Sequence, residues 1–387
     1  MSFRAVPIGE LVEPVKSWNP RTMPEGKFSY IDLSAVDQIE KRITGATSLR
    51  GSEAPSRARQ LIKSGDILVS TVRPNLNGVA VVTEKFDDAT ASTGFCVLRS
   101  RIECLDNNYL KHWVRSPSFV ESMVKQATGA SYPAVSDRIV KSSRIPLPPL
   151  EEQRRIAAIL DKADALRRKR KRALSLVKSI GHSSYHLTVG GSYLLRVPFE
   201  EAVFFQEGPG VRNWQFRDEG VKLINVRNIV NGRLDISNTN RFISEHEITS
   251  RYKHFLLEPG DFVLASSGVT WGKIAEVKEA DLPLCLNTSV IRIRPRPPYS
   301  KAYVRLFIES GDFRNQIERL ITGSAQPNFG PSHLKQVIIP SISSDSQIKL
   351  ERLDMRVHTH HERLLMAIET SESLFTSLQH RAFTGQL

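Results

Sequence analysis

Residues 61–70 read Leu-Ile-Lys-Ser-Gly-Asp-Ile-Leu-Val-Ser, and residues 255–266 read Phe-Leu-Leu-Glu-Pro-Gly-Asp-Phe-Val-Leu-Ala-Ser. Both stretches carry a Gly-Asp turn that leads into an apolar run, and they lie about 194 residues apart. A second pair has nearly the same spacing, because Thr-Gly-Ala-Ser-Tyr-Pro at 128–133 corresponds to Thr-Gly-Ser-Ala-Gln-Pro at 322–327. A repeat of this length is a whole domain, unlike the short unit of a solenoid. The sequence therefore predicts two copies of one globular domain.

Each copy combines short strands with helices. β-Branched runs between turns predict strands at 66–71, 78–82 and 93–99, and again at 261–266, 273–277 and 287–292. Apolar residues at helical spacing predict helices that begin at Asn107 and Ser116 in the first copy and span 300–309 and 312–320 in the second. The expected fold class is mixed α/β (α+β).

Each copy ends in Ile-Pro and is followed by a long amphipathic stretch. Apolar residues there recur at steps of three and four, which is typical of a coiled-coil seam. Arg170 interrupts the first seam, and His360 and Ser371 interrupt the second. Because neither seam is continuous, we expect the two helices to pair with each other as an antiparallel coiled coil. The predicted seam consists of Ile156, Ile159, Ala163, Leu166, Val177, Leu350, Leu353, Val357, Leu364 and Leu374.

These patterns divide the chain into four segments with a pseudo-two-fold internal repeat. We expect one globular domain at 1–149, a central spacer helix at 150–185, a second domain at 186–341 and a C-terminal spacer helix at 342–387. About 30 helical residues make a rod of roughly 45 Å, a little over one turn of B-DNA.

The composition favours a polyanionic partner. The net charge is +13 with a pI of about 9.7, and neutralising phosphates releases counterions. A basic protein that is merely soluble would have the same composition. No apolar run of 18 residues predicts a membrane span, and the first residues lack the apolar core of a signal peptide. Three cysteines without C-x-x-C spacing fit a reducing compartment, so we expect a cytoplasmic protein.

The first spacer helix carries the densest charge, with ten basic residues against four acidic ones at 151–180. Such a run is either a solvated helix face or a face that contacts phosphates or a partner protein. The basic residues of interest are Arg154, Arg155, Arg167, Arg168, Lys169, Arg170, Lys171 and Arg172.

The turns after the paired strands are the candidates for contact with bases. Arg and Lys can address guanine and Asn can address adenine, so different side chains on one scaffold would read different sequences. The candidates are Arg73, Asn75 and Asn77 in one copy and Thr270, Trp271 and Lys273 in the other. Serine and threonine hydroxyls beside them could donate to phosphates, namely Ser70, Thr71, Ser266 and Ser267. The Thr-Gly loops add Ser131, Tyr132, Gln326 and Asn328. Any of these can also be an ordinary turn residue.

Catalytic motifs are missing from the sequence. It contains no G-x-x-x-x-G-K-[ST] phosphate loop, no H-E-x-x-H and no paired cysteines. His358, His360 and His361 point in successive directions on a helix, so we expect a surface cluster and no metal site. We expect no catalytic residues in this chain.

Residues 145–161 read Ile-Pro-Leu-Pro-Pro-Leu-Glu-Glu-Gln-Arg-Arg-Ile-Ala-Ala-Ile-Leu-Asp, which strongly resembles the specificity (S) subunit of type I restriction-modification systems. Thr-Gly-Ser-Ala-Gln-Pro-Asn at 322–328 and Ala-Phe-Thr-Gly-Gln-Leu at 382–387 extend the resemblance over the chain. The second copy departs at 340–347, where Pro-Ser-Ile-Ser-Ser-Asp-Ser-Gln keeps the first proline and the glutamine but lacks the Glu-Glu pair.

The resemblance implies a non-catalytic DNA-binding subunit. Two target recognition domains would each read one half of an asymmetric bipartite sequence in double-stranded DNA, with the paired helices setting the spacing. Two methylation (M) subunits with S-adenosylmethionine and restriction (R) subunits with ATP and Mg²⁺ would be its partners, and this chain would bind no cofactor. The residues leave two alternatives open: a self-sufficient DNA methyltransferase or nuclease with degenerate motifs, and a basic coiled-coil adaptor.

Overall fold

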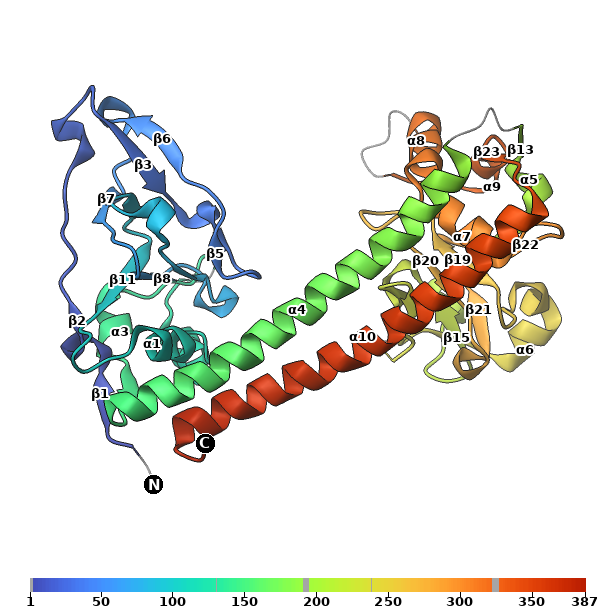
Figure 1. The fold of residues 1–387 in the computed structure, drawn as a ribbon. Helices are drawn as coiled ribbons and strands as arrows, with labels where there is room; N and C mark the ends of the chain where they lie inside the picture. The colour runs from blue at the N-terminus through green and yellow to red at the C-terminus, as the bar shows by residue number, and fades with distance from the viewer. Residues whose placement is uncertain (1–2, 130, 191–194, 238, 322–326) are drawn as a thin grey trace. The chain divides into compact units, whose positions relative to one another are not determined.

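The computed structural model describes residues 3–129, 131–190, 195–237, 239–321 and 327–387 (Figure 1). Its contacts divide the chain into two compact units. Unit 1 comprises Met1–Lys171 and Met366–Leu387, and unit 2 comprises Arg172–Leu365. Each unit therefore holds one globular domain together with part of both long helices.

The domain of unit 1 contains two four-stranded sheets. One has the order β2 (Val12–Glu13), β11 (Phe95–Ser100), β8 (Ile67–Ser70) and β9 (Val79–Val81), and all its pairs are antiparallel. The other has the order β6 (Thr47–Arg50), β3 (Lys27–Ile31), β10 (Thr90–Ser92) and β7 (Ala58–Leu61). The central strands β8 and β11 are apolar on both faces, because each face packs on a separate core cluster.

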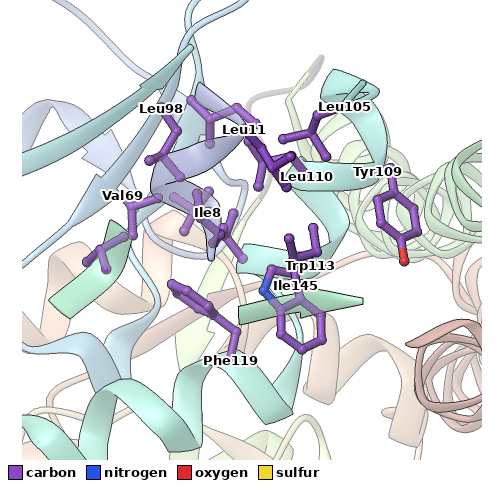
Figure 2. Close-up of a cluster of buried hydrophobic side chains, with 14 of the residues drawn as sticks. Ile8, Leu11, Val69, Leu98, Leu105, Tyr109, Leu110, Trp113, Phe119 and Ile145 are labelled. Carbon is purple, nitrogen blue, oxygen red and sulfur yellow. The ribbon is translucent and has the colours of Figure 1, made fainter. Parts of the chain in front are cut away.

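Three short helices cover one of these cores. They are α1 (Asn107–Val114), α2 (Pro117–Gln126) and α3 (Asp137–Ser142). Side chains of Asp106, Ser116 and Ser136 accept from backbone N–H groups in the first turns and cap them. The predicted helix starts at Asn107 and Ser116 are thus confirmed. Figure 2 shows Tyr109 and Trp113 of α1 and Phe119 of α2 in this core with Ile8 and Ile145.

Unit 2 repeats the arrangement. One sheet has the order β14 (Val203–Glu207), β22 (Val290–Pro295), β19 (Phe262–Ala265) and β20 (Ile274–Glu276). The other has the order β18 (Phe242–Ile243), β15 (Val221–Ile224) and β21 (Leu284–Leu286). The helices are α7 (Lys301–Ile308), α8 (Gly311–Leu320) and α9 (Pro331–Leu334), with α5 (Phe199–Ala202) and α6 (Glu245–Glu247) as further short elements. The predicted mixture of strands and helices in both copies is confirmed.

Small two-stranded pairs complete each domain. In unit 1, β1 (Ala5–Pro7) pairs with β12 (Arg144–Pro146), and β4 (Val36–Asp37) with β5 (Arg42–Ile43). In unit 2, β13 (Arg196–Pro198) pairs with β23 (Ile338–Pro340), and β16 (Ile229–Val230) with β17 (Arg233–Leu234). The first pair in each unit joins the domain's beginning to its end, directly before a long helix.

Equivalent side chains make equivalent bonds in the two domains. The Asp66 carboxylate accepts two hydrogen bonds from Arg99, at 2.8 and 2.7 Å, and Asp261 accepts two from Arg294, at 2.7 and 3.1 Å. Asp66 and Asp261 are the aspartates of the two Gly-Asp turns. In both domains the aspartate of the Gly-Asp turn therefore binds an arginine of the neighbouring strand, β11 in unit 1 and β22 in unit 2.

The long helices are α4 (Leu150–Val189) and α10 (Ser344–Thr384). α4 ends four residues beyond the predicted end of the spacer at 185. Within unit 1 the two helices run antiparallel, because rising numbers on α4 meet falling numbers on α10. Arg167 pairs with Glu372 at 2.9 Å, and Arg170 donates to the carbonyl oxygen of Ala367 at 2.7 Å. The interruption at Arg170 is thus satisfied by the backbone of the partner helix.

The predicted seam is wrong at two positions. Leu166 and Leu374 are 43% and 50% exposed, while Phe375 is buried. The buried side of α10 here follows Ser371, Phe375, Gln379 and Ala382. The buried side of α10 differs from the predicted seam because α10 packs on α1 as well as on α4. The ring centroid of Phe383 on α10 lies 5.3 Å from that of Tyr109 on α1. A pattern read for a helix pair alone misses this second contact.

The other seam positions turn inward to different degrees. Ile156 and Leu350 are buried. The half-buried positions are Ile159, Ala163, Val177, Leu353, Val357 and Leu364. Within the described ranges, no helix is long and apolar enough to span a membrane.

Candidate nucleic-acid interface

A strained turn joins β8 to β9 in unit 1. Arg73 and Asn77 have φ values of 50° and 48°, in the left-handed region that few side chains adopt. They flank a single 3-10 turn at Pro74–Leu76. The Arg73 and Asn75 side chains are exposed, whereas Asn77 is half-buried and its Nδ2 donates to the carbonyl oxygen of Arg115 at 3.2 Å. Asn77 is therefore held inside, and only Arg73 and Asn75 remain accessible to a base.

The Thr-Gly loop docks on this turn. The backbone N–H of Arg73 donates to the carbonyl oxygen of Pro133 at 2.7 Å, and that of Val135 donates to Thr71 at 2.9 Å. The docking brings the Arg73 guanidinium carbon to 4.7 Å from the centroid of the Tyr132 ring. Tyr132 is 67% exposed and Ser131 is exposed. Two predicted residues from distant segments thus form one cation–π pair at the surface.

A pocket of about 190 Å³ lies beside this pair. Its walls combine apolar side chains with the Arg73 and Tyr132 side chains, and they come from β8, β11, the turn at 72–78, the Thr-Gly loop and the segment around Val36. The pocket can receive a flat or apolar group while Arg73 supplies hydrogen-bond donors. Its full lining is Leu33, Val36, Gln38, Ser70, Val72, Arg73, Leu76, Gly78, Phe95 and Tyr132.

Unit 2 builds the equivalent turn with other side chains. Ser267 and Asn328 form a β-bridge, and the N–H of Gly268 donates to the carbonyl oxygen of Pro327 at 3.1 Å. The turn therefore docks on the second loop as the first turn does. Asn328 and Lys273 are exposed, while Ser267 and Thr270 are half-buried. Gln326 lies outside the described residues.

Trp271 is a structural residue here. It is 8% exposed and packs edge-on against Phe329, with ring centroids 5.9 Å apart. The Arg314 guanidinium covers its outer face at 4.6 Å. The expectation that Trp271 contacts bases is therefore wrong, because the ring is buried against Phe329 and covered by Arg314.

Three of the predicted phosphate donors also point inward. Thr71 is buried and its hydroxyl donates to the carbonyl oxygen of Gly94 at 2.8 Å. The Ser70 hydroxyl donates to Val72 at 2.8 Å, and Ser266 is fully buried. The Thr71 and Ser70 hydroxyls stabilise the first turn, and the Ser266 hydroxyl is buried without a partner among the described residues. None of the three is placed to donate to a phosphate at the surface.

Val269 and Arg314 were missed by the sequence reasoning. Val269 is fully exposed at the tip of the unit 2 turn, between Gly268 and Thr270. An apolar side chain between a glycine and a polar residue in a turn was an available signal. An exposed valine can contact a thymine methyl group, which neither Arg73 nor Asn75 would favour. Nothing in the local sequence indicated that Arg314 would cover Trp271.

The basic run of α4 divides into paired and unpaired side chains. Arg167 pairs with Asp164 and Glu372 and lies 4.4 Å from the Phe375 ring, and Lys171 pairs with Glu372 at 2.7 Å. Arg168 pairs with Asp164, and Arg155 with Glu152. Exposed residues of the run without an ion pair among the described residues are Arg154, Lys169 and Arg172.

No metal centre is evident in the part of the chain that the structure describes, where no group of three His, Cys, Asp or Glu side chains could hold an ion. His358 and His361 lie near Glu362, at 4.0 and 3.9 Å, and Glu362 also pairs with Arg233. The carboxylate is thus engaged by an arginine. The arrangement is an ion-pair network that ties α10 to β17.

Comparisons with known proteins give a consistent result. The family model described as type I restriction modification DNA specificity domain matches residues 25–176. The specificity subunit of the type I restriction enzyme MjaVIII from Methanocaldococcus jannaschii is 25% identical over 365 residues, covering 87% of this chain and 82% of that protein.

Two solved structures share the fold. One, from work on complex assembly and conformational transition of a type I R-M system, has a TM-score of 0.62 at 24% identity and covers 100% of this chain and 98% of that chain. The type I restriction-modification S subunit from M. genitalium has a TM-score of 0.58 at 15% identity, covering 98% and 96%. Two similar domains with long helices are therefore an architecture already seen in solved proteins.

Proposed function

This chain belongs to the DNA specificity subunits of type I restriction-modification systems, and from that premise we propose that its two domains read different half-sites through the turns after β8 and β19. The family supplies DNA recognition and not catalysis, so neither a self-sufficient methyltransferase or nuclease nor a basic adaptor is favoured. The proposal concerns which residues of this chain carry the recognition.

One observation carries the proposal. In both units the turn after the strand docks on the Thr-Gly loop, but the side chains exposed there differ between the units. In unit 1 this arrangement exposes Arg73 stacked on Tyr132. In unit 2 it exposes Val269 and Asn328. Arg donates to guanine O6 and N7, whereas valine favours the methyl group of thymine. The target is therefore asymmetric, with a different base preference in each half.

The base-reading surface and the basic helix have separate roles in this proposal. Contacts with phosphates fix the position of the protein without reading sequence. Arg154, Lys169 and Arg172 are exposed and lack ion pairs among the described residues, so they suit a phosphate or an acidic partner surface. Replacing them would weaken binding to every duplex by a similar factor.

The proposal extends to the partners and the location. Two methylation subunits would bind this chain and hold S-adenosylmethionine, and restriction subunits would hold ATP and Mg²⁺. Support for both kinds of partner comes from the family of the chain. The family also supports a cytoplasmic location, where the DNA target lies. A complex purified with tagged methylation subunits would test the expected ratio of two per specificity subunit by native mass spectrometry.

The test of half-site reading uses Arg73→Ala in the complex with methylation subunits. Sequencing of methylated sites in a host that carries the complex should show relaxed specificity at one position of one half-site. Competition binding at fixed salt should show a loss of about 1 to 3 kcal/mol for the cognate base only. An unchanged target sequence would remove Arg73 from the reading surface.

Arg101→Ala is the matched control. Arg101 is also an exposed arginine, but it follows β11 at the end opposite Ser70, because Phe95 pairs with Ser70 and Leu98 pairs with Ile67. The control variant should keep the target sequence and the affinity. A relaxation of the same position by both variants would indicate a general loss of positive charge and not a lost base contact.

A further inference from the structure

Two cavities occupy the same place in the two units. The unit 1 cavity, of about 290 Å³, lies among α1, the β4–β5 hairpin tip, α4 and α10. The unit 2 cavity, of about 360 Å³, lies among α7, the β16–β17 hairpin, α4 and α10. Counting along the repeat, Arg115 of the first corresponds to Glu309 of the second, and Arg168 corresponds to Glu362. The chain therefore holds two versions of one cavity with reversed charges at two positions.

The linings differ in charge. The unit 2 cavity is balanced, with Arg233, Lys273 and Arg305 against Glu309, Asp354 and Glu362. The unit 1 cavity has five basic side chains against two acidic ones, which are Lys41, Arg115, Arg167, Arg168 and Lys171 against Glu40 and Asp164. Glu372 pairs with Arg167 and Lys171 from just outside this lining, and basic groups remain in excess when it is included.

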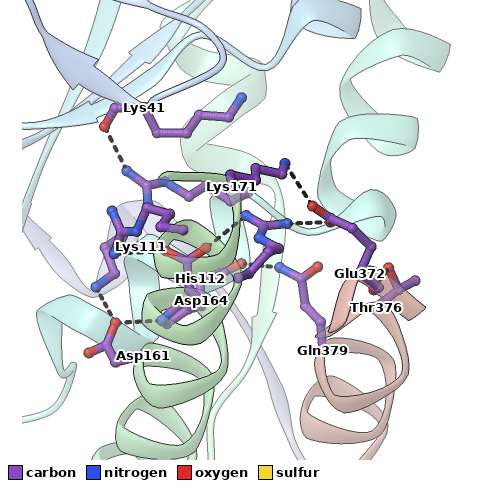
Figure 3. Close-up of polar contacts among 12 residues, drawn as sticks. Lys41, Lys111, His112, Asp161, Asp164, Lys171, Glu372, Thr376 and Gln379 are labelled. Carbon is purple, nitrogen blue, oxygen red and sulfur yellow. Dashed lines mark hydrogen bonds and ion pairs between the residues drawn. The ribbon is translucent and has the colours of Figure 1, made fainter. Parts of the chain in front are cut away.

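Part of this excess lies on buried donor atoms of Arg115 and Arg167, whereas Arg168 and Lys171 are about half exposed. Arg115 forms no ion pair among the described residues, and its guanidinium donates to the carbonyl oxygen of Lys41 at 3.1 Å. The Nε atoms of Arg115 and Arg167 and the Nδ1 atom of His112 are buried without a hydrogen-bond partner in the described part of the chain. Figure 3 shows the cluster, with Lys41 from the hairpin, Lys171 and Asp164 from α4 and Glu372 from α10.

Burial and mutual repulsion penalise these cations. Burial lowers the pKa of Arg115 to about 10, and Arg168 and Arg167 act in the same direction. Burial lowers the pKa of Lys41 to about 8, with Arg115 and Arg167 adding to the effect. Asp164 acts on Arg115 in the opposite direction, but the lining holds more cations than carboxylates, so an anion in the cavity would lower the cost of burying them.

We propose that the unit 1 cavity binds inorganic phosphate. Its volume accommodates a phosphate group, and its guanidinium groups present the donor geometry that oxyanions prefer. The unit 2 cavity would not bind the same ion, because Glu309 and Glu362 stand where Arg115 and Arg168 stand in unit 1.

The acceptors in the cavity favour a protonated phosphate. Asn77 Oδ1 is buried without a donor, and the orientation of this amide is set by the bond from Nδ2 to Arg115. Hydrogen phosphate carries a P–OH group that can donate to such an oxygen, whereas sulfate and the phosphodiesters of DNA carry none. The site should therefore bind phosphate more tightly than sulfate and should not depend on DNA.

The experiment measures the melting temperature of the full chain against phosphate concentration, with NaCl adjusted to constant ionic strength and sulfate as a parallel titrant. A ligand of the native state raises the melting temperature as its concentration rises. Phosphate should raise it more than sulfate. Arg168→Glu, which introduces the charge found at Glu362, should shift the half-saturating phosphate concentration upward at least about tenfold, as expected for one charged hydrogen bond.

Lys273→Glu is the matched control, because it makes the same charge change in the lining of the unit 2 cavity. Its phosphate response should equal that of the parent chain. Arg168 is 53% exposed and Lys171 is 50% exposed, so neither replacement opens a cavity in the core, and Lys171→Glu serves if Arg168→Glu does not fold.

The remaining outcomes overturn the proposal. A melting temperature that follows ionic strength alone, or a phosphate response that survives in both unit 1 variants, places no ion in this cavity. Equal responses to phosphate and sulfate remove the role given to Asn77. If a duplex abolishes the phosphate response and Arg168→Glu weakens duplex binding equally, the cavity serves the DNA backbone and not a free phosphate.

Discussion

Gln153 of α4 and Gln347 of α10 make the same bond in the two units. The Oε1 atom of Gln153 accepts from the backbone N–H of Asp106 at 2.9 Å, and that of Gln347 accepts from Ser300 at 2.7 Å. Asp106 and Ser300 are the N-cap residues of α1 and α7. Each glutamine thus joins a long helix to the N-terminus of a short helix of its own domain, α1 in unit 1 and α7 in unit 2. This explains why the second copy keeps the glutamine while it loses the Glu-Glu pair.

Replacing Gln153 by alanine should destabilise unit 1 more than the equivalent change destabilises unit 2. Gln153 also donates to Cys104 and Pro148 at 3.0 and 2.9 Å, whereas Gln347 makes one further bond at 3.5 Å. Because the contact with Pro148 is buried and that with Cys104 is partly buried, Gln153→Ala should cost about 1 to 3 kcal/mol and Gln347→Ala less. Hydrogen exchange of α1 and α7 amides would measure each unit separately.

Glu151→Ala supplies the control for that comparison. Glu151 is exposed in the first turn of α4, so its loss should change the stability by no more than about 0.5 kcal/mol. If Gln153→Ala and Glu151→Ala alter exchange in α1 equally, the glutamine is not the fastening residue.

The Tyr132 ring should matter for recognition through the position of Arg73. Tyr132→Phe keeps the ring under the guanidinium and should leave half-site preference unchanged. Tyr132→Leu removes the cation–π contact, worth about 0.5 to 1 kcal/mol at an exposed site, so cognate affinity should fall several-fold. Competition binding with cognate and single-base variant duplexes would measure both effects. Equal affinities for Tyr132→Phe and Tyr132→Leu would show that the ring does not orient Arg73.

His112 should make unit 1 less stable in acid. Its ring is buried, and burial lowers its pKa even though the hydrogen bond with Asp161 at 2.9 Å acts in the opposite direction. Below a pH of about 6.5 the unfolded chain binds a proton that the folded chain binds less readily, so stability falls as the pH falls through this range. The free energy of unfolding should therefore decline more from pH 7.5 to 5.5 in the parent chain than in His112→Gln. Parallel declines would show that His112 contributes nothing to the pH dependence.

The sequence predicted the shared fold of the two domains because that fold depends on local signals that occur in both copies. Ser116 and Ser310 each cap a helix that begins at the following residue, and the aspartates of the Gly-Asp turns each bind an arginine of the neighbouring strand. Such signals act within one or two elements. They survive in both copies, so comparing the copies reveals them.

The candidate site was predicted less well because exposure is decided by contacts between distant segments. Trp271 is buried by Phe329 and covered by Arg314, and Leu374 turns outward because α10 packs on α1. Neither fact follows from residues adjacent in sequence. The pairing of Arg73 with Tyr132 likewise depends on a loop that docks from about 60 residues away. Both residues were identified, but their contact was not.

Lys41 gives a prediction that joins the pH dependence of stability to the unit 1 cavity. Its pKa in the folded chain is about 8, and that of an unfolded lysine is about 10.4. Between these values the unfolded chain binds more protons, so stability should rise as the pH increases from about 8 to 10. Lys41→Met should remove this rise. At pH 7 it should also stabilise unit 1, on the order of 1 kcal/mol after allowance for partial exposure.

Phosphate should abolish the same rise in the parent chain. An anion beside the Nζ atom of Lys41 would return the pKa of this group toward the value of an unfolded lysine, because it supplies the missing counter-charge. Urea unfolding at several pH values between 7 and 10, with and without phosphate at constant ionic strength, measures the effect. Lys41→Met should show a flat profile in both conditions. A rise that persists in Lys41→Met would assign it to another group and separate Lys41 from the charge of the cavity.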